Sequence, residues 1–414
     1  MLDGRLDVPF KQYRYNECFL REGQCYGYFG LAPSILRIAG FLVSGSTDLN
    51  PSPLVIALGA TVALWAAIDL ALGVAGAEPR GDRLSPANRI RLIILVALLL
   101  GPGGLLVFLS QAKIYYEAII LMVAALLVAF ACVQRWIADR RPIYLIVALV
   151  AAVIATNSRP SAILPTVILG IGVILLSRKN RSQRRRWAQA LGAAITILPV
   201  SSALGIMWLK FRAFTPQYST YSGFDPEAFQ RLIDANGGVL QGPRFTLTAI
   251  ANYLRPDSVS IDATWPWFSH AVPDHVPPLY IHPITPDGLY PEYVASLTTT
   301  MPVALALTVA VPLLIIIGVV RLTPVQLRSF TLLGLAAASC AALIVTTFAL
   351  STRYLGDFVP LLSVGTVFGV FLLIRRHQGG STVAGVLLGL MALSSALTFL
   401  VNLGLHQQSY LIPG

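Results

Sequence analysis

Two opposite charges stand close together where an apolar segment of the sequence begins. Arg353 and Asp357 are four residues apart, a spacing that places both side chains on one face of an α-helix. They can neutralise each other there, which would be a purely structural role. Alternatively, Asp357 orients Arg353, whose guanidinium makes paired hydrogen bonds to phosphate oxygens. The pattern therefore indicates either a structural ion pair or a phosphate-binding site, with Tyr354 between the two charges.

Further charges stand near the ends of other apolar segments. Arg159 follows one of them, and a charge at that depth is costly unless it meets water, a partner or a lipid head group. Phosphate contact and a side chain that simply extends to water are both open for Arg159. Glu117 begins another segment after Tyr115 and Tyr116, where it could join the same polar site or cap its helix. Asp69 lies deeper in its segment and is expected to pair within the bundle.

The segments that must position these charges are apolar enough to cross a bilayer. The 414 residues are 56% hydrophobic and only 12% charged, which a water-soluble surface cannot accommodate. Crossing roughly 30 Å of hydrocarbon takes about 20 helical residues. We expect an all-α polytopic membrane protein with about ten transmembrane helices, at 54–77, 90–109, 116–137, 143–157, 160–177, 188–209, 301–320, 329–350, 355–374 and 381–403.

Basic residues are concentrated in alternate gaps between these segments. The formal net charge is +11, and Lys and Arg gather in the gaps at 80–91, 135–141, 178–186, 321–328 and 375–376. Such alternation is the positive-inside rule, so we expect these gaps on the cytoplasmic side. This topology accounts for the positive charge, and no nucleic-acid partner is expected.

The same topology puts the two longest polar stretches together on the extracytoplasmic side. Residues 210–300 are acidic, rich in Pro, Trp and Tyr, and too long for a plain connection, so we expect a partly folded module there. The expected order is an extracytoplasmic segment at 1–53 with an interfacial helix over 28–44, transmembrane helices over 54–209, the module at 210–300, transmembrane helices over 301–403 and an extracytoplasmic tail at 404–414. This organisation predicts a multi-pass protein of the plasma (inner) membrane.

The N-terminal segment has two features of its own. Residues 1–53 carry several basic residues and no signal peptide that would export them, so we expect a missing upstream helix. Cys18 and Cys25 bracket a short polar turn, and in an oxidising compartment they could close a hairpin disulfide. Two free thiols are the alternative.

Aromatic and imidazole groups stand out in the 210–300 module. Apolar ring faces such as those of Trp265, Trp267 and Phe268 suit sugar stacking, but Trp also gathers at membrane interfaces, which is the favoured interpretation. The histidines show no spacing typical of a zinc site, so no metal is expected at His270, His275 and His282.

Several short motifs together resemble a known family. The first outer loop of bacterial GT-C glycosyltransferase-like proteins, especially actinobacterial ones, is similar to residues 2–9 (LDGRLDVP), 17–19 (ECF) and 23–34 (GQCYGYFGLAPS). Later motifs agree at 115–118 (YYEA), 157–161 (NSRPS) and 352–360 (TRYLGDFVP). The resemblance runs over about residues 2–375.

The resemblance implies a hexosyl- or pentosyltransferase that moves a sugar from a polyprenyl-phosphate donor to a cell-envelope glycan, lipid or protein outside the membrane. An acid near the start of the first outer loop serves that superfamily as catalytic base, removing the proton of the acceptor hydroxyl. That acid is expected upstream of this chain, and Asp3 and Asp7 are the nearest remaining candidates, although each could instead end a turn or cap a helix. Donor phosphate would be bound by Arg353 and Arg159, supported by Asp357, Glu117 and Tyr354. A divalent cation is compatible with this chemistry, and the sequence indicates no particular cofactor.

Two other functions stay open alongside the transferase. A transporter or flippase for a lipid-linked sugar would commonly show repeated halves and discontinuous spans around a midplane site. The polar features of this sequence gather on one face instead, which favours the transferase. A noncatalytic, truncated homologue is the third hypothesis, because the front end of the resembling family has no counterpart here.

Overall fold

The computed structural model describes residues 19–45, 51–76, 84–101, 114–178, 183–214, 234, 242–270, 296–347, 352–376 and 381–411, apart from residues 23, 28, 29 and 266. Thirteen α-helices account for most of these residues. The strands that are described form only two antiparallel pairs, β1–β2 and β3–β4. An all-helical membrane architecture was expected, and the described chain has that character.

Six helices of the described chain are long and apolar enough to cross a membrane, which indicates a multi-pass membrane protein. They are α2 (Ser52–Ala75), α5 (Ile114–Asp139), α7 (Ile163–Ser177) together with the 3₁₀ turn η3 (Pro160–Ala162) before it, α8 (Gln183–Phe211), α13 (Pro324–Val345) and α15 (Ser381–Leu411).

The expectation of about ten such helices is wrong. The remaining four segments form shorter helices, namely α3 (Pro86–Leu100), α6 (Pro142–Thr156), α12 (Pro302–Ile316) and α14 (Val359–Arg376). The 15 residues of α3, α6 and α12 each span roughly 22 Å and the 18 of α14 roughly 27 Å, less than the roughly 30 Å of a hydrocarbon core. Proline opens α3, α6 and α12 and fixes where each begins. The runs expected at 90–109 and 301–320 extend past the ends of α3 and α12, whereas the run expected at 143–157 has the same length as α6.

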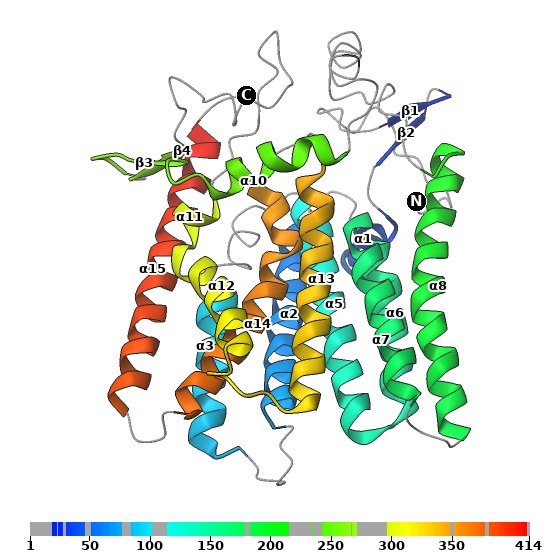
Figure 1. The fold of residues 1–414 in the computed structure, drawn as a ribbon. Helices are drawn as coiled ribbons and strands as arrows, with labels where there is room; N and C mark the ends of the chain where they lie inside the picture. The colour runs from blue at the N-terminus through cyan, green and yellow to red at the C-terminus, as the bar shows by residue number, and fades with distance from the viewer. Residues whose placement is uncertain are drawn as a thin grey trace.

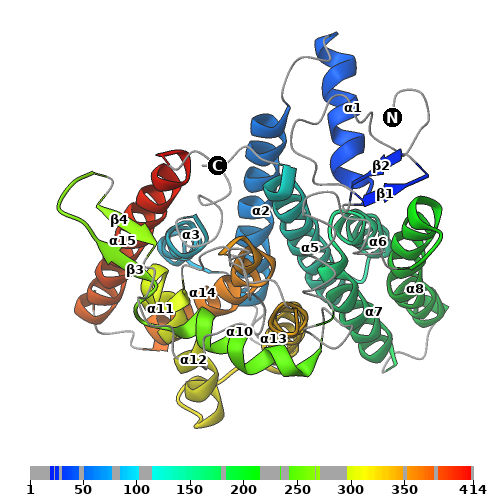
Figure 2. The same cartoon turned by 90° about the horizontal axis from the view of Figure 1, so that it is seen from above.

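Helix α5 forms the centre of the helical bundle. In the most apolar 18-residue stretch of α5, 83% of the residues are buried, whereas in the corresponding stretches of the other five long helices between 28% and 50% are buried. It packs against α2 on one side and α6 on the other (Figures 1 and 2). The neighbouring pair α7 and α8 approaches closely at two glycines, because a Cβ on Gly170 would lie 2.7 Å from the Gly192 carbonyl oxygen. Small residues at such a crossing let two membrane helices pack backbone to backbone.

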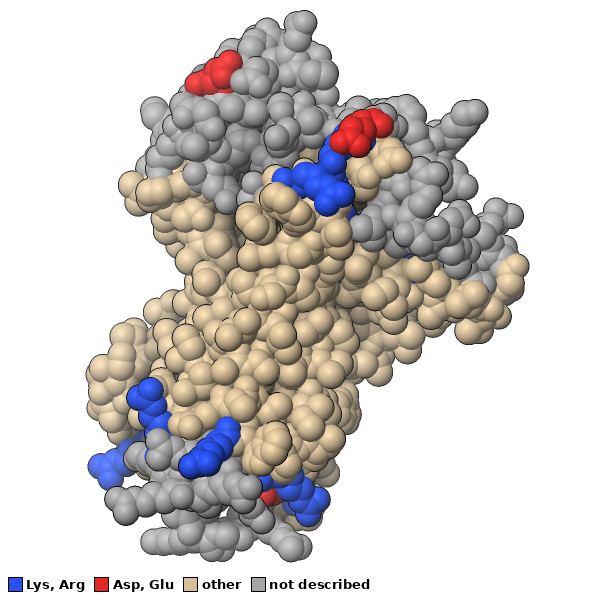
Figure 3. All heavy atoms as spheres, turned by 90° about the vertical axis from the view of Figure 1, so that its right-hand side faces the viewer, with Lys and Arg blue, Asp and Glu red and all other residues tan. Residues whose placement is uncertain are grey.

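The two ends of the bundle carry different elements (Figure 1). One end, called the outer end below, carries the hairpin β1 (Phe19–Arg21) and β2 (Gln24–Tyr26), helix α1 (Ala32–Ser44), helix α10 (Thr246–Leu254) and the hairpin β3 (Val259–Ile261) and β4 (Phe268–His270). The turn between α5 and α6, with Arg140 and Arg141, lies at the opposite, inner end. Figure 3 shows Lys and Arg side chains near both ends and a belt free of described charges between them, as a bilayer-crossing surface requires.

Helix α1 lies across the bundle rather than along it. It is seen nearly end-on in Figure 1 and lengthwise in Figure 2. Apolar side chains on it remain uncovered, including Ile35, Leu42 and Val43. This is the orientation and surface of a helix lying in a membrane interface.

Candidate functional site

Arg159 and Asp357 meet at the outer end of the bundle. Arg159 stands between α6 and the turn η3, and Asp357 ends a second 3₁₀ turn, η6 (Thr352–Asp357), which leads into α14. The Nε atom of Arg159 lies 3.0 Å from Oδ1 and 3.1 Å from Oδ2 of Asp357. Both residues are buried, with Arg159 8% exposed and Asp357 0% exposed. Two residues 198 positions apart in the sequence thus form a buried ion pair.

Only one edge of the Arg159 guanidinium is used in this pair. Its Cζ atom lies 5.5 Å from the centre of the Tyr354 ring, so the aromatic face supports the cation. The described residues offer no hydrogen-bond acceptor to its Nη1 and Nη2 groups. A guanidinium that is fixed through Nε and open at its two terminal amino groups can donate two parallel hydrogen bonds to an oxyanion such as phosphate.

The local backbone explains why Tyr354 and Asp357 serve the same arginine. The sequence expectation placed Arg353 and Asp357 on one face of an α-helix, but residues 352–357 form a 3₁₀ turn. Residues three apart eclipse each other in a 3₁₀ turn, so Tyr354 and Asp357 share a face. Asp357 was expected to orient Arg353, and the contact that the structure describes for Asp357 is with Arg159. The side chain of Arg353 lies outside the described residues.

The N-terminal segment docks beside Arg159. The Ala32 backbone N–H donates to the Asn157 carbonyl oxygen at 3.1 Å. Asn157 is held in turn by its Nδ2 group, which donates to Ser202 Oγ at 2.8 Å. Gly30 lies directly against Asn157, because a Cβ there would stand 2.0 Å from the Asn157 carbonyl oxygen. This contact brings the first outer segment to the candidate site.

Gly30→Ala is expected to detach this segment from the turn after α6. The added methyl group would overlap a backbone atom that cannot rotate away, and overpacking of this kind costs about 1–3 kcal/mol. Limited proteolysis of the reconstituted protein should show faster cleavage before α1 in the variant than in wild type. Gly27→Ala is the control, because a Cβ at Gly27 would meet open space. Gly45 also has open space around it, but its φ of +67° would strain an alanine. Equal cleavage of the Gly30 and Gly27 variants would contradict the contact.

A second buried ion pair joins three helices near the same end. Arg37 of α1 donates from Nε to Glu117 Oε2 at 2.9 Å and from Nη2 to Glu117 Oε1 at 2.8 Å. The same Nη2 group donates to Ser52 Oγ, at the start of α2, at 2.8 Å. Glu117 is 0% exposed. Neither of the roles expected for Glu117 included this partner, which lies 80 residues away in the sequence. Its contacts make it an anchor for α1.

The third pair lies at the inner end and has a different character. Arg135 donates from Nε to Asp69 Oδ2 at 2.9 Å, and its Nη2 contacts Oδ1. Asp69 was expected to pair within the bundle, and it does. The pair borders a cleft of about 460 Å³ that also includes Arg89 and Tyr144. Arg135 is 44% exposed. The cleft lies at the inner end of the bundle and is therefore separate from the Arg159 site at the outer end.

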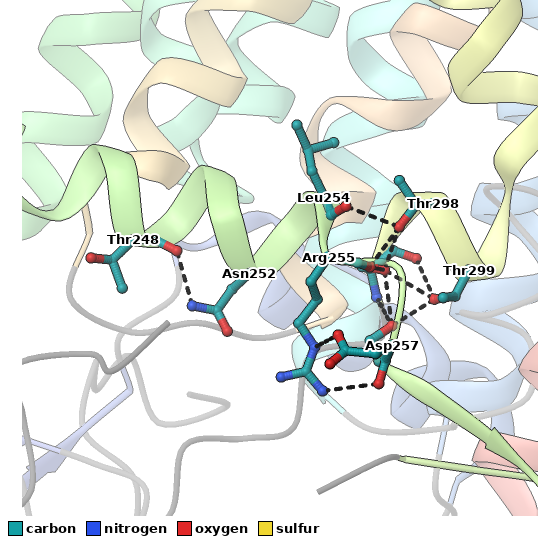
Figure 4. Close-up of polar contacts among 9 residues, drawn as sticks. Thr248, Asn252, Leu254, Arg255, Asp257, Thr298 and Thr299 are labelled. Carbon is teal, nitrogen blue, oxygen red and sulfur yellow. Dashed lines mark hydrogen bonds and ion pairs between the residues drawn. The ribbon is translucent and has the colours of Figure 1, made fainter. Parts of the chain in front are cut away.

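A cluster of hydroxyl groups joins the residues after α10 to the residues around 296–299 at the outer end of the bundle (Figure 4). Ser258 Oγ donates to Ser296 Oγ at 2.9 Å, and Thr298 Oγ1 donates to the Arg255 carbonyl oxygen at 2.6 Å. Arg255 itself lies 3.3 Å from Asp257 through its Nε atom. These bonds tie the end of α10 to helix α11 (Leu297–Thr300). No sequence pattern indicated this cluster, because single Ser and Thr residues are common in any loop.

Some expected site residues lie outside the described part of the chain. They are Asp3, Asp7 and Cys18, together with the side chain of Cys25, whose backbone belongs to β2. Within the described residues, no group of three His, Cys, Asp or Glu side chains could hold a metal ion.

Comparison with known proteins adds no relative to this picture. No known protein family matches the sequence. A search of curated proteins likewise finds no match.

Proposed function

We propose that this chain is a membrane glycosyltransferase of the GT-C type. It would transfer a sugar from a polyprenyl-phosphate donor to a cell-envelope acceptor on the outer side of the plasma membrane. The observation that carries the proposal is the Arg159 guanidinium, held by Asp357 and Tyr354 and open at Nη1 and Nη2. The short motifs that resemble GT-C proteins include Arg159, Tyr354 and Asp357.

The chemistry would use this guanidinium on the leaving group. As the bond between the sugar and the phosphate oxygen breaks, the polyprenyl phosphate gains negative charge. Two N–H donors fixed in a water-poor site stabilise that charge without reorganising. Asp357 would keep the guanidinium oriented, and Arg353 is the second candidate cation.

The acceptor hydroxyl would need a carboxylate to take its proton. Glu117 is a poor candidate, since it is buried and makes two hydrogen bonds to Arg37. We therefore assign the base to an acid of the N-terminal segment, with Asp3 and Asp7 as candidates.

The position of the site also favours transfer over transport. Transporter sites lie near the bilayer midplane between repeated halves. Arg159 and Asp357 follow or precede helices at the outer end, where α1 and α10 lie across the bundle. A lipid-linked phosphate in the outer leaflet would reach this depth.

The test is a transfer assay with the full-length protein in proteoliposomes. The substrates are a panel of polyprenyl-phosphate hexoses and pentoses with labelled sugars, and cell-envelope fractions serve as acceptors. Arg159→Lys keeps the positive charge but removes the two-pronged donor, and we expect transfer to fall about 10²- to 10³-fold, as when an oxyanion donor is lost.

Arg135→Lys is the matched control, because it makes the same change in the ion pair at the inner end. It should transfer sugar at the wild-type rate. Undiminished transfer by Arg159→Lys would remove Arg159 from the site. Movement of the intact lipid-linked sugar between leaflets, with no transfer, would show a flippase instead.

A further inference from the structure

The hairpin β3–β4 projects sideways from the outer end of the bundle. In both Figure 1 and Figure 2 its strands extend past α15, at the edge of the helices. The strands are antiparallel, with Ile261 opposite Phe268 and Ser260 opposite Ser269. A two-stranded hairpin alone is marginally stable in water, so we expect the end of this hairpin that projects past α15 to contact another surface.

The two faces of this hairpin differ in polarity. Side chains alternate along a strand, so Val259, Ile261 and Phe268 share one face and Ser260 and Ser269 the other. Val259 and Phe268 pack on Val401 and Leu405 of α15. Ile261, farther along the same face, is 81% exposed. Ile261 is therefore left uncovered on this apolar face, although Phe268 opposite it packs on α15.

The tip beyond Ile261 carries two exposed tryptophans. Trp265 is 52% exposed and Trp267 is 44% exposed. Their rings meet edge to face, with centroids 4.8 Å apart. Trp267 has a φ of +65°, which is an unusual conformation for a bulky residue. Backbone bonds hold it there, from Trp267 N–H to Thr264 O and from Asp262 N–H to Trp267 O, each at 2.8 Å. A strained backbone thus keeps two large rings together at the surface.

Helix α15 shows what lies beneath the hairpin. Exposed apolar side chains repeat along it at the three- and four-residue spacing of one helix face, at Val386, Leu390, Leu393, Leu397 and Leu400. A stripe of this kind on a membrane-crossing helix faces lipid. Val401 lies 20 residues beyond the start of α15 at Ser381, which is roughly 30 Å along a helix and close to the thickness of the hydrocarbon core. A helix that enters the hydrocarbon at Ser381 would therefore leave it close to the hairpin.

We propose that the tip of the β3–β4 hairpin inserts Ile261, Trp265 and Trp267 into the outer interface of the bilayer beside α15. Trp has a large apolar ring and one N–H donor, and for that reason it partitions to this depth. The hairpin packs on Val401 and Leu405, at the outer end of the exposed stripe of α15, and the serine face is left for water. Glycan stacking on the two rings is the competing possibility, and it gives no role to the exposed Ile261. The proposal does not depend on the transferase function.

Tryptophan fluorescence of the full-length protein in liposomes tests this insertion. The liposomes contain phosphatidylcholine and phosphatidylglycerol with acyl chains brominated near the head group, which quench only Trp rings at that depth. The protein has 6 Trp, so the signal of the tip is the difference between wild type and the variant with both Trp265→Phe and Trp267→Phe. We expect this difference to be quenched by the brominated lipids and protected from aqueous acrylamide.

Two neighbouring substitutions test whether the apolar face of the hairpin is the one that contacts lipid. Ile261→Asn should reduce lipid quenching of the tip, and Ser260→Asn, on the opposite face of the same strand, should leave it near the wild-type level. Helical content measured by circular dichroism verifies that both variants fold. Quenching of the tip by acrylamide with none by lipid would overturn the proposal. So would a change in tip emission with soluble oligosaccharides in place of lipid quenching, which would show a glycan site.

Discussion

Arg159→Ala is expected to destabilise the protein by about 3–5 kcal/mol, the usual cost of removing one partner from a buried ion pair. The substitution leaves Asp357 charged, 0% exposed and without the guanidinium that lies 3.0 Å away. Burial in the bundle prevents water from replacing that partner. The free energy of unfolding in nanodiscs, from denaturant titration followed by circular dichroism, measures the loss.

The double variant Arg159→Met with Asp357→Leu distinguishes the cost of an unpaired buried charge from the cost of losing the pair as a whole. Replacing a buried ion pair by apolar residues of similar volume is often neutral or stabilising, so much of the lost stability should return. Arg135→Ala is the matched comparison, because this arginine is 44% exposed. An exposed pair contributes about 0–1 kcal/mol. A loss for Arg159→Ala no larger than that for Arg135→Ala would contradict a tightly buried pair.

The fold could be predicted from the sequence to the level of helices, but the lengths of some helices could not. Each of the ten apolar runs contains a helix, since hydropathy alone shows where a chain can cross lipid. Four of these helices are short, and proline at the first turn of α3, α6 and α12 sets their start. These starts lie within four residues of the expected ones, and the differences are at the C-terminal ends, since α3 ends at Leu100 and α12 at Ile316.

The candidate site shows a different limit. Arg159, Tyr354 and Asp357 each stood out in the sequence as charges or rings at segment ends. Their grouping did not, because it depends on a 3₁₀ turn and on a contact across 198 positions. An α-helical spacing rule applied to residues 352–357 brings Arg353 next to Asp357, whereas three residues per turn brings Tyr354 there. Local spacing therefore identified the residues, and the contact between Arg159 and Asp357 could not be derived from it.

The interfacial helix illustrates how a polar residue in an apolar run can be decisive. Residues 28–44 were expected to lie in the interface partly because Arg37 interrupts them. In the structure that arginine points into the bundle and binds Glu117 and Ser52. A single sequence contains no information on which distant carboxylate will meet a given arginine. The interfacial position of α1 stays a prediction, and the bond that holds this helix could not be predicted from the sequence.

Arg37→Ala is expected to cost more stability than Glu117→Ala, although the two residues form one pair. Removing Arg37 leaves Glu117 with 0% exposure and no cation, at a cost of about 3–5 kcal/mol. Removing Glu117 leaves an arginine whose side chain is already 22% exposed. That guanidinium keeps its bond to Ser52 and can extend toward water, so the loss should be smaller.

The difference between these two variants, measured as free energies of unfolding in nanodiscs, tests whether α1 is anchored by burial of the carboxylate. Arg37→Lys is a useful third variant, because one ammonium cannot reproduce the two bonds from Nε and Nη2 to the carboxylate oxygens. It should lie between wild type and Arg37→Ala. Equal losses for Arg37→Ala and Glu117→Ala would mean that both charges reach water, and the buried anchor would then be refuted. The expected asymmetry would mean that α1 is held to α5 through the buried carboxylate of Glu117, whose charge is neutralised in the described bundle by Arg37 alone. Any ligand or lipid that displaces Arg37 must then supply a cation of its own.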